Sequence, residues 1–249
     1  KAILTIHNFG GISNIRKIEN IAKKNNLILI EDISETLLSK DKKKYVGVSN
    51  DLKLTKLSFS SLHATKTITT GEGGIIFLNN RILSDKIKNI RDHGIKDPKK
   101  YLYHRLGGNF RISNLLAAIG CAQLKRINEI KKRKKFIINY YINNLTNNRN
   151  IKFQKDPKNF TLVKWGFPII VKNLKIRNSL INQLNKNSTI CRPSFLSLNY
   201  MQHLGFKKND KEFKSARYLQ DRILILPMHI NLSSQNLSYI CNIINNNFR

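Results

Sequence analysis

Apolar and polar residues follow one another along the first thirty positions in a pattern typical of a strand, a helix and a second strand. Residues 2–6 are apolar and β-rich and end near two glycines, and isoleucines then recur at near-helical spacing through residues 12–26. Residues 27–30 form a second apolar run that ends at Glu31 and Asp32. This order predicts a βαβ unit in which the parallel sheet is buried on both faces.

The same reasoning extends to the rest of the chain. Further strands are predicted at residues 57–62, 74–78, 160–171 and 223–226. Further helices are predicted at residues 84–91, 113–145, 176–184 and 234–244. We expect a domain boundary near residue 140, with the long helix joining a larger α/β domain (1–140), which has a mainly parallel sheet, to a smaller α+β domain (141–249).

The charge of the chain at first suggests a nucleic-acid partner. Forty-five Lys and Arg against 15 Asp and Glu give a formal net charge of +30. However, 35 Ile, 32 Asn and 32 Lys accompany only 13 Arg, an excess that A/T-rich codons produce whatever the function. Lys and Arg are consecutive at 131–135, and five neighbours turn through a full helical circuit, so we expect this run to be exposed. A basic nucleic-acid-binding protein is therefore retained only as an alternative.

The cysteines indicate a reducing, cytoplasmic setting, since Cys121, Cys191 and Cys241 are odd in number and contain no CxxC. The six histidines show no HExxH or other metal-ligand spacing, so no metal site is expected. No uncharged stretch is apolar enough to span a bilayer. The chain opens at Lys1 directly on a strand-like run, which suggests a fragment.

Four short features stand out, and each has an ordinary structural interpretation. Glu31 and Asp32 at a strand end are also typical of a helix cap. Lys66, in a loop between strands, is on its own most simply a solvated lysine. The TGEGG run after it is compatible with an ordinary hairpin connection. The GGNFR run is compatible with a turn into a helix capped by Asn109 or Ser113.

Taken together, these features resemble the nucleotide-sugar aminotransferases of the DegT/StrS type, which are pyridoxal-phosphate (PLP) enzymes of fold type I. The resemblance rests on EDISE at 31–35, SSLHATKTITTGEGG at 60–74 and GGNFRISNLLAAIGCAQL at 107–124, with shorter matches IHNFGG, RDHG, ICRPSF and ILILPMH. The HATKTITTGEGG stretch is most similar to the perosamine-synthase-like branch. The family's N-terminal third is absent, so the resemblance implies an incomplete PLP-binding domain that alone is poorly soluble or inactive, with a sheet edge left uncovered.

The resemblance also assigns roles to residues of the cofactor site. It implies that Lys66 bonds PLP covalently and that Asp32 partners the pyridine nitrogen. Glu35 matches a position near the ring hydroxyl, and Ser61 matches a phosphate-binding serine. Asn109 matches an asparagine that reaches the cofactor phosphate of a neighbouring subunit, which implies a homodimer. Independently of the resemblance, a hydroxyl suits a phosphate, and a carboxylate suits a pyridine nitrogen that must stay protonated.

Three more residues are assigned to the substrate. Arg192 and Arg111 match positions near the nucleotide sugar, and His63, three residues before the lysine, is a candidate contact to the substrate or the ring, with simple packing as the other interpretation. Near Lys66 the sequence shows no charged residue until Glu72.

The resemblance implies that glutamate donates the amino group and that a 4-keto-6-deoxy nucleotide sugar receives it, for surface polysaccharide or related glycan synthesis. Relatives that dehydrate sugars carry histidine where this chain has Lys66, which favours transamination. A catalytically inactive relative of the same fold is a second alternative, and retention of Lys66 and Asp32 argues against it. The nucleotide, the sugar stereochemistry and the aminated carbon (C3 or C4) stay open.

Overall fold

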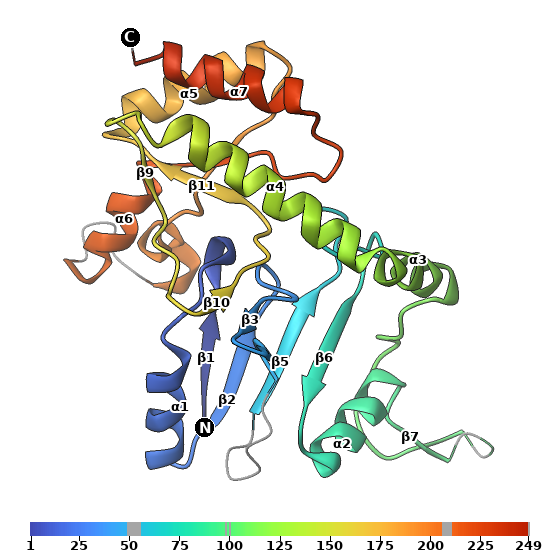
Figure 1. Cartoon of the computed structure of the whole chain (residues 1–249). Coiled ribbons are helices and arrows are strands. Elements are labelled where there is room, and N and C mark those ends of the chain that lie inside the picture. The colour runs from blue at the N-terminus through green and yellow to red at the C-terminus, as the bar shows by residue number, and fades with distance from the viewer. Residues whose placement is uncertain (49–55, 98, 100, 206–210, 249) are drawn as a thin grey trace. The chain divides into compact units, whose positions relative to one another are not determined.

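The computed structural model describes residues 1–48, 56–97, 99, 101–205 and 211–248 (Figure 1). The chain divides into two compact units, which are described separately. Unit 1 comprises Lys1–Ile127 with Pro157–Trp165, and unit 2 comprises Asn128–Asp156 with Gly166–Arg249. The chain thus first passes from unit 1 to unit 2 after Ile127, earlier than the expected boundary near residue 140. The short segment Pro157–Trp165 returns to unit 1.

Unit 1 is built on a four-stranded sheet with the order β1-β2-β5-β6, seen in the lower part of Figure 1. Its strands are β1 (Ala2–Ile6), β2 (Ile28–Asp32), β5 (Lys56–Ser61) and β6 (Gly74–Leu78). The pairs β1–β2 and β2–β5 are parallel, and β6 pairs with β5 in the antiparallel sense. The predicted α/β class with a mainly parallel sheet is confirmed. Because Asp32 pairs with Phe59, the carboxyl ends of β2 and β5 lie at the same edge.

Helix α1 (Ile15–Lys24) covers only one face of this sheet. Ala22 of the helix and Leu29 of β2 are completely buried, and they pack with Ile3, Ile15, Ile18 and Leu27. Side chains alternate between the faces of a strand, so Leu4 and Ile6 point away from this cluster and are 55% and 48% exposed. The expectation that the sheet is buried on both faces is therefore wrong for the described residues.

The remaining elements of unit 1 are short strands and two helices. A small sheet of order β10-β3-β4 joins a late segment to an early one. The elements are β3 (Lys40–Asp41), β4 (Lys44–Tyr45), β10 (Phe160–Thr161), β7 (Ile95–Asp97), β8 (Leu102–Tyr103), the 3-10 turn η1 (Asn8–Gly10), α2 (Arg81–Arg91) and α3 (Asn114–Lys125). The predicted strand at 160–171 is thus two strands, of which β10 belongs to unit 1. The split arises because the segment between the two strands bonds to an early part of the chain. The Val163 amide donates to the Ser39 hydroxyl, and the Trp165 amide donates to the Glu35 carbonyl.

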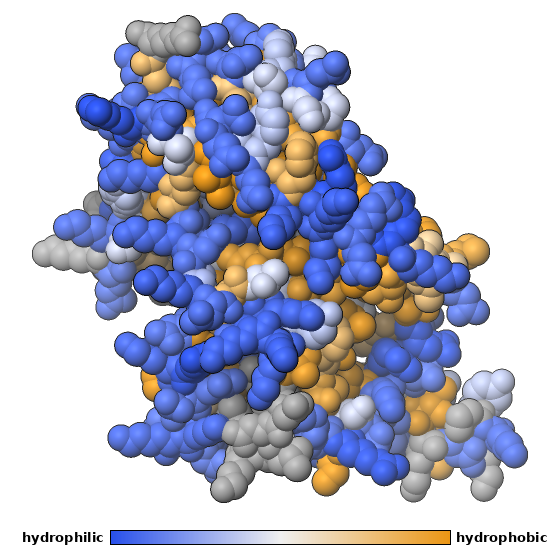
Figure 2. All heavy atoms as spheres, in the orientation of Figure 1, coloured by the Kyte–Doolittle hydropathy of each residue, from blue (hydrophilic) through white to orange (hydrophobic). Residues whose placement is uncertain are grey.

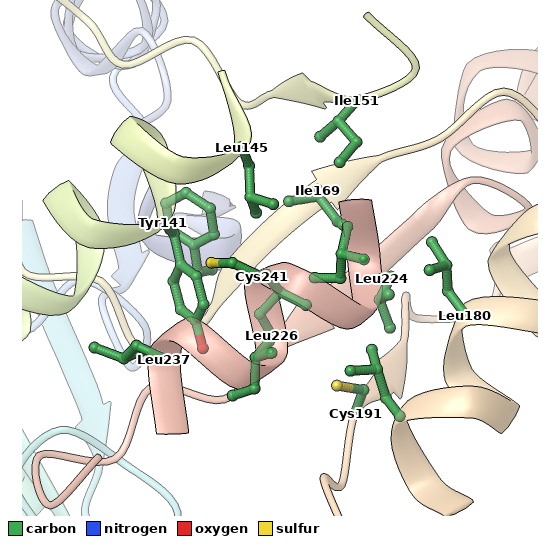
Figure 3. Packing of buried hydrophobic residues seen from close by; sticks show 14 of the residues in the cluster. Tyr141, Leu145, Ile151, Ile169, Leu180, Cys191, Leu224, Leu226, Leu237 and Cys241 are labelled. Atoms are coloured by element: carbon green, nitrogen blue, oxygen red, sulfur yellow. The ribbon is translucent and has the colours of Figure 1, made fainter. Parts of the chain in front are cut away.

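Unit 2 is an antiparallel sheet of order β12-β13-β11-β9 with a large apolar core (Figure 3). The strands are β9 (Lys152–Phe153), β11 (Phe167–Ile170), β12 (Arg192–Pro193) and β13 (Ile223–Leu226). The helices are α4 (Ile127–Leu145), α5 (Leu174–Lys186), α6 (Lys214–Gln220), α7 (Ser234–Asn246), and the 3-10 turns Leu198–Tyr200, Gln202–Leu204 and Lys211–Phe213. Leu180 and Leu237 bring α5 and α7 into the core beside Ile169 and Leu224.

The predicted helix at 113–145 is two helices, because α3 ends at the cap residue Arg126 and α4 begins at once. Ser113, one of the two predicted caps, accepts a hydrogen bond from the amide of Leu116 at 3.4 Å. Helix α4 packs Tyr141 and Leu145 into the core of unit 2, and the Tyr141 hydroxyl donates to the Pro227 carbonyl at 3.0 Å. This packing explains why nearly all of α4, from Asn128 onward, belongs to unit 2.

The basic run on α4 is not uniformly exposed. Lys134 is only 5% exposed, although its neighbours Lys132 and Lys135 are exposed. Arg133 donates to the carbonyl oxygens of Ile230 and Leu232 in the same unit. The expectation of an exposed run is thus wrong for Lys134. Burial lowers the pKa of Lys134 from 10.5 to about 8.

Replacing this buried amine with an apolar chain of similar length, Lys134→Met, should stabilise unit 2 near neutral pH. A folded-state pKa below the unfolded value means that folding opposes the charged form, so the cost is complete below about pH 8 and vanishes as the pH rises toward 10.5. At about 1.4 kcal/mol per pKa unit, the gain should be at most about 3 kcal/mol. Urea denaturation at pH 7 and pH 10 measures it, with exposed Lys135→Met as the matched control. A gain as large at pH 10 as at pH 7 would contradict this account.

Candidate functional site

Asp32 is the last residue of β2, and its carboxylate is organised by the turn that follows. The Ser34 amide donates to Asp32 Oδ1 at 2.9 Å, and the His7 amide donates to the Asp32 carbonyl at 3.1 Å. The residues directly after Asp32 form a turn and not a helix, so the interpretation of this residue as a helix cap is wrong. Among the described residues, Asp32 Oδ2 accepts no hydrogen bond and is left for another donor.

Glu35 lies in the same turn and is almost completely buried, with 7% of the residue exposed. Its Oε2 accepts a hydrogen bond from the Phe9 amide at 2.5 Å. Phe9 has a φ of 56°, so the η1 turn that follows β1 points this amide toward the carboxylate. The turns after β1 and β2 thus meet at Glu35.

The loop between β5 and β6 carries Lys66. The Leu62 amide donates to the Gly73 carbonyl at 2.8 Å, which joins the two ends of the loop. Inside the loop, the Lys66 amide donates to the His63 carbonyl at 2.9 Å. Gly71 and Gly73 have φ values of 84° and 141°, which residues other than glycine rarely adopt. The TGEGG run does connect paired strands, and its glycines close a loop long enough to display a lysine.

The Lys66 side chain turns toward Glu35 and Trp165. Its Nζ lies 3.8 Å from Glu35 Oε1 and 4.8 Å from the centroid of the Trp165 ring. Only 17% of the Lys66 side chain is exposed, so the interpretation of a solvated lysine is wrong. The sequence shows no charge near Lys66 until Glu72, whereas in space the nearest carboxylate is contributed by a residue 31 positions earlier.

Burial raises the pKa of Glu35, and this is the largest influence on it. The Phe9 amide and the charge of Lys66 act in the opposite direction, and the charge of Asp32 raises the Glu35 pKa further. Since Asp32 and Lys66 both act on the same carboxylate, the structure brings all three residues together in unit 1.

Ser61, at the end of β5, adjoins this group. Its amide donates to the Ser34 hydroxyl at 2.9 Å, and its own hydroxyl accepts from the His63 amide at 3.2 Å. The accepting role leaves the Ser61 proton available to an anion. Ser34 therefore links the Asp32 carboxylate to the strand that carries Ser61. His63 is about half exposed, and its ring contacts Thr65 and Glu72, both within its own loop.

Asn109 and Arg111 lie elsewhere in unit 1, on an exposed segment before α3. Arg111 contacts Asn109 Oδ1 at 3.3 Å and Asp92 Oδ1 at 3.2 Å, and Asn109 pairs with Asp92 in a short antiparallel bridge. Neither has a described contact with Lys66. Arg192 is exposed on β12 and belongs to unit 2. Unit 1 thus gathers Asp32, Glu35, Ser61, His63 and Lys66 at the carboxyl ends of β2 and β5. Within the described part of unit 1, Asn109 and Arg111 have no contact with this group.

Sequence reasoning missed three members of this group: Ser34, Phe9 and Trp165. Ser34 acts through its hydroxyl oxygen, which accepts from the Ser61 amide, and Phe9 acts through its backbone amide, which donates to Glu35. No residue pattern in the sequence reveals either contact. Trp165 lies about a hundred positions after Lys66, and only its being the single tryptophan of the chain distinguishes it. Its indole N–H donates to the Thr65 carbonyl at 2.7 Å.

The described residues contain no group of three or more His, Cys, Asp or Glu side chains arranged to hold a metal ion. Within the same residues, no helix has both the length and the apolar character needed to cross a membrane.

The sequence of this chain is similar to a known protein family along almost its whole length. A model of the DegT/DnrJ/EryC1/StrS aminotransferase family matches residues 1–245. The GDP-perosamine synthase of Escherichia coli O157:H7 is 32% identical over 245 residues, which cover 98% of this chain and 65% of that protein. This chain therefore spans just under two thirds of the length of that relative.

Two solved structures show the same fold. The aminotransferase TlmJ from Streptoalloteichus hindustanus superposes with a TM-score of 0.90 at 18% identity, covering 99% of this chain and 65% of that one. The PLP form of Spr1654 from Streptococcus pneumoniae has a TM-score of 0.87 at 20% identity, covering 99% and 68%. The predicted fold type is thereby confirmed.

Proposed function

The chain belongs to the DegT/DnrJ/EryC1/StrS aminotransferase family, and on that premise we propose that it is part of a PLP-dependent sugar aminotransferase. The observation that carries the proposal is the convergence of Asp32, Glu35 and Lys66 at one edge of a mainly parallel sheet. Ligands of such sheets bind at the carboxyl ends of the strands, and these residues lie there.

The polar groups at this edge suit PLP. The cofactor combines an aldehyde, a ring nitrogen and a phosphate, so it needs an amine, an acceptor and donors. Lys66 offers a largely buried amine, Asp32 Oδ2 is free of described partners, and the Ser61 hydroxyl keeps its proton. We propose that these residues hold the cofactor, with Glu35 near the ring hydroxyl. When bound, PLP supplies an electron-withdrawing ring that stabilises negative charge on the reacting carbon.

The chemical work of the protein then falls to two side chains. Lys66 would bond the cofactor and, when its amine is free, would hold and release a proton at its Nζ. Asp32 would keep the pyridine nitrogen of the bound cofactor protonated through charge attraction, on the order of 5 kcal/mol for two opposite charges in contact before desolvation is subtracted.

For the reactants we propose a 4-keto-6-deoxy nucleotide sugar as acceptor and glutamate as donor. The support is the likeness to a GDP-perosamine synthase along nearly the whole chain. His63, Arg111 and Arg192 are proposed to bind the nucleotide sugar, and the guanidinium groups suit its phosphates. Surface polysaccharide or related glycan synthesis is the proposed context, and a cytoplasmic location, based on the cysteines, stays a prediction.

The two alternatives are less well supported. The basic run at 131–135, which suggested a nucleic-acid partner, is only partly presented to solvent, because Lys134 is buried and Arg133 donates to backbone carbonyl oxygens. An inactive relative would have no need to keep both Lys66 and Asp32 close enough for their charges to influence the buried Glu35 carboxylate.

The experiment that tests the proposed function uses the protein as its gene encodes it, loaded with PLP. Incubation with L-glutamate alone should release one 2-oxoglutarate per active site, and addition of a GDP- or UDP-linked 4-keto-6-deoxy sugar should make release continuous, with amino sugar as the product. A protein that binds PLP but gives neither product would contradict the proposal.

We also propose a homodimer in which Asn109 reaches the neighbouring subunit's cofactor phosphate. Apolar side chains around Asn109 are largely exposed in the single chain: Leu106 is 97%, Leu115 81% and Phe110 71% exposed. Figure 2 shows hydrophobic spheres gathered over α3, which begins just after this segment. Apolar clusters of this kind are typical of surfaces that bind another chain.

Leu115→Glu should therefore weaken the dimer by placing a charge in an apolar contact, at a cost of about 2–4 kcal/mol, or roughly thirtyfold or more in Kd. Sedimentation velocity over a concentration series measures the shift toward monomer. The control is Ile82→Glu, the same kind of change at a 71% exposed residue of α2. An unchanged sedimentation profile in Leu115→Glu would show that this face is not the interface.

A further inference from the structure

The single tryptophan of the chain lies beside the amine that is proposed to bond the cofactor. Lys66 Nζ is 4.8 Å from the Trp165 ring centroid and 3.8 Å from Glu35 Oε1. The side chains of Lys66 and Glu35 are 17% and 8% exposed, so water screens these contacts only weakly. A carboxylate and the electron-rich face of an aromatic ring both attract a cation.

Two hydrogen bonds fix Trp165 in this place. Its backbone amide donates to the Glu35 carbonyl at 3.2 Å, and its indole N–H donates to the Thr65 carbonyl at 2.7 Å. Thr65 directly precedes Lys66, and Glu35 is the other partner of the amine. The indole is thus tied to both segments that position the amine, and it cannot turn away without losing the Thr65 bond.

We propose that Glu35 and Trp165 form a holding site for the Lys66 ammonium, which is filled whenever this amine is not bonded to the cofactor. Trp165 is then a positioning residue: it keeps the free amine beside Glu35, in the turn after β2, instead of in solvent. The role in catalysis rests on the proposed function, whereas the contacts themselves belong to the chain without cofactor.

Fluorescence of the cofactor-free protein tests the contact directly. The Trp165 emission is obtained by subtracting the spectrum of Trp165→Phe from that of the parent protein. The subtraction removes the emission of all other fluorescent residues. Lys66→Met should change this emission. Lys86→Met, at an exposed lysine of α2, should keep the parent emission.

A second measurement separates holding from general structural support. A held ammonium reacts slowly with an acetylating reagent, so Trp165→Leu should raise the acetylation rate of Lys66 about threefold to tenfold, the range expected for one cation–ring contact. Trp165→Phe keeps a ring face and should stay nearer the parent, and Lys86 in the same samples should react equally in all three proteins. Mass spectrometry of peptides gives the rates.

The holding site is overturned if Lys66→Met leaves the Trp165 emission unchanged, or if Lys66 reacts at the parent rate in Trp165→Leu. Either result stands whether or not PLP binds. Conversely, a parent protein that never acquires the absorbance of lysine-bound PLP refutes the proposed function while the two measurements above still decide the holding site, so the two failures are distinguishable.

Discussion

Lys66→Ala is expected to abolish transamination, with a loss on the order of 10⁴-fold or more, because one amine both bonds the cofactor and moves the proton. The variant should also lose the visible absorbance of lysine-bound PLP. The change removes a side chain that contacts Glu35 and Trp165 but lies outside the apolar clusters, so the fold should survive. Product formation under saturating PLP measures the effect.

The matched control is Lys86→Ala on α2, which removes an exposed lysine and should keep both absorbance and activity. Circular dichroism checks that both variants remain folded. Activity of Lys66→Ala within tenfold of the parent would mean that another group performs the chemistry.

Asp32→Asn should produce the second largest effect, a loss of about 10³- to 10⁴-fold in kcat. This range follows from the charge attraction of about 5 kcal/mol at an effective dielectric constant near 20, which is an upper estimate. The amide is isosteric and its oxygen can still accept the Ser34 hydrogen bond, so the turn should persist. Unlike Lys66→Ala, this variant should still bond PLP, because Lys66 is intact.

Steady-state kinetics and the visible spectrum together check this prediction. The control is Asp85→Asn, at a 65% exposed carboxylate of α2, which should behave as the parent. A loss of less than tenfold in Asp32→Asn would mean that the pyridine nitrogen has a different partner.

The parts of the fold and site that sequence predicts are those written in local patterns. The strand at Ala2–Ile6 and the acidic residues that end β2 follow from hydrophobic runs and the residues that bound them. The position of Lys66 between two paired strands follows in the same way.

What sequence does not predict depends on contacts between distant segments. Trp165 reaches Lys66 because residues 157–165 return to unit 1, and no periodicity encodes that return. Lys134 is buried on α4, whose second half packs into the core of unit 2, whereas a run of five basic residues indicates only exposure. Among the described residues, Asn109 and Arg111 have no described contact with Lys66, and Arg192 belongs to the other unit, so no local pattern relates these three residues to the lysine.

The central claim is that one particular amine bonds the cofactor, and reductive trapping tests it most directly. The protein as its gene encodes it is incubated with PLP, reduced with borohydride, digested and mapped by mass spectrometry. The account predicts a phosphopyridoxyl group on the peptide that contains Lys66, close to one per chain, and none after Lys66→Ala. A label spread over several of the 32 lysines, or concentrated on a different one, would contradict it.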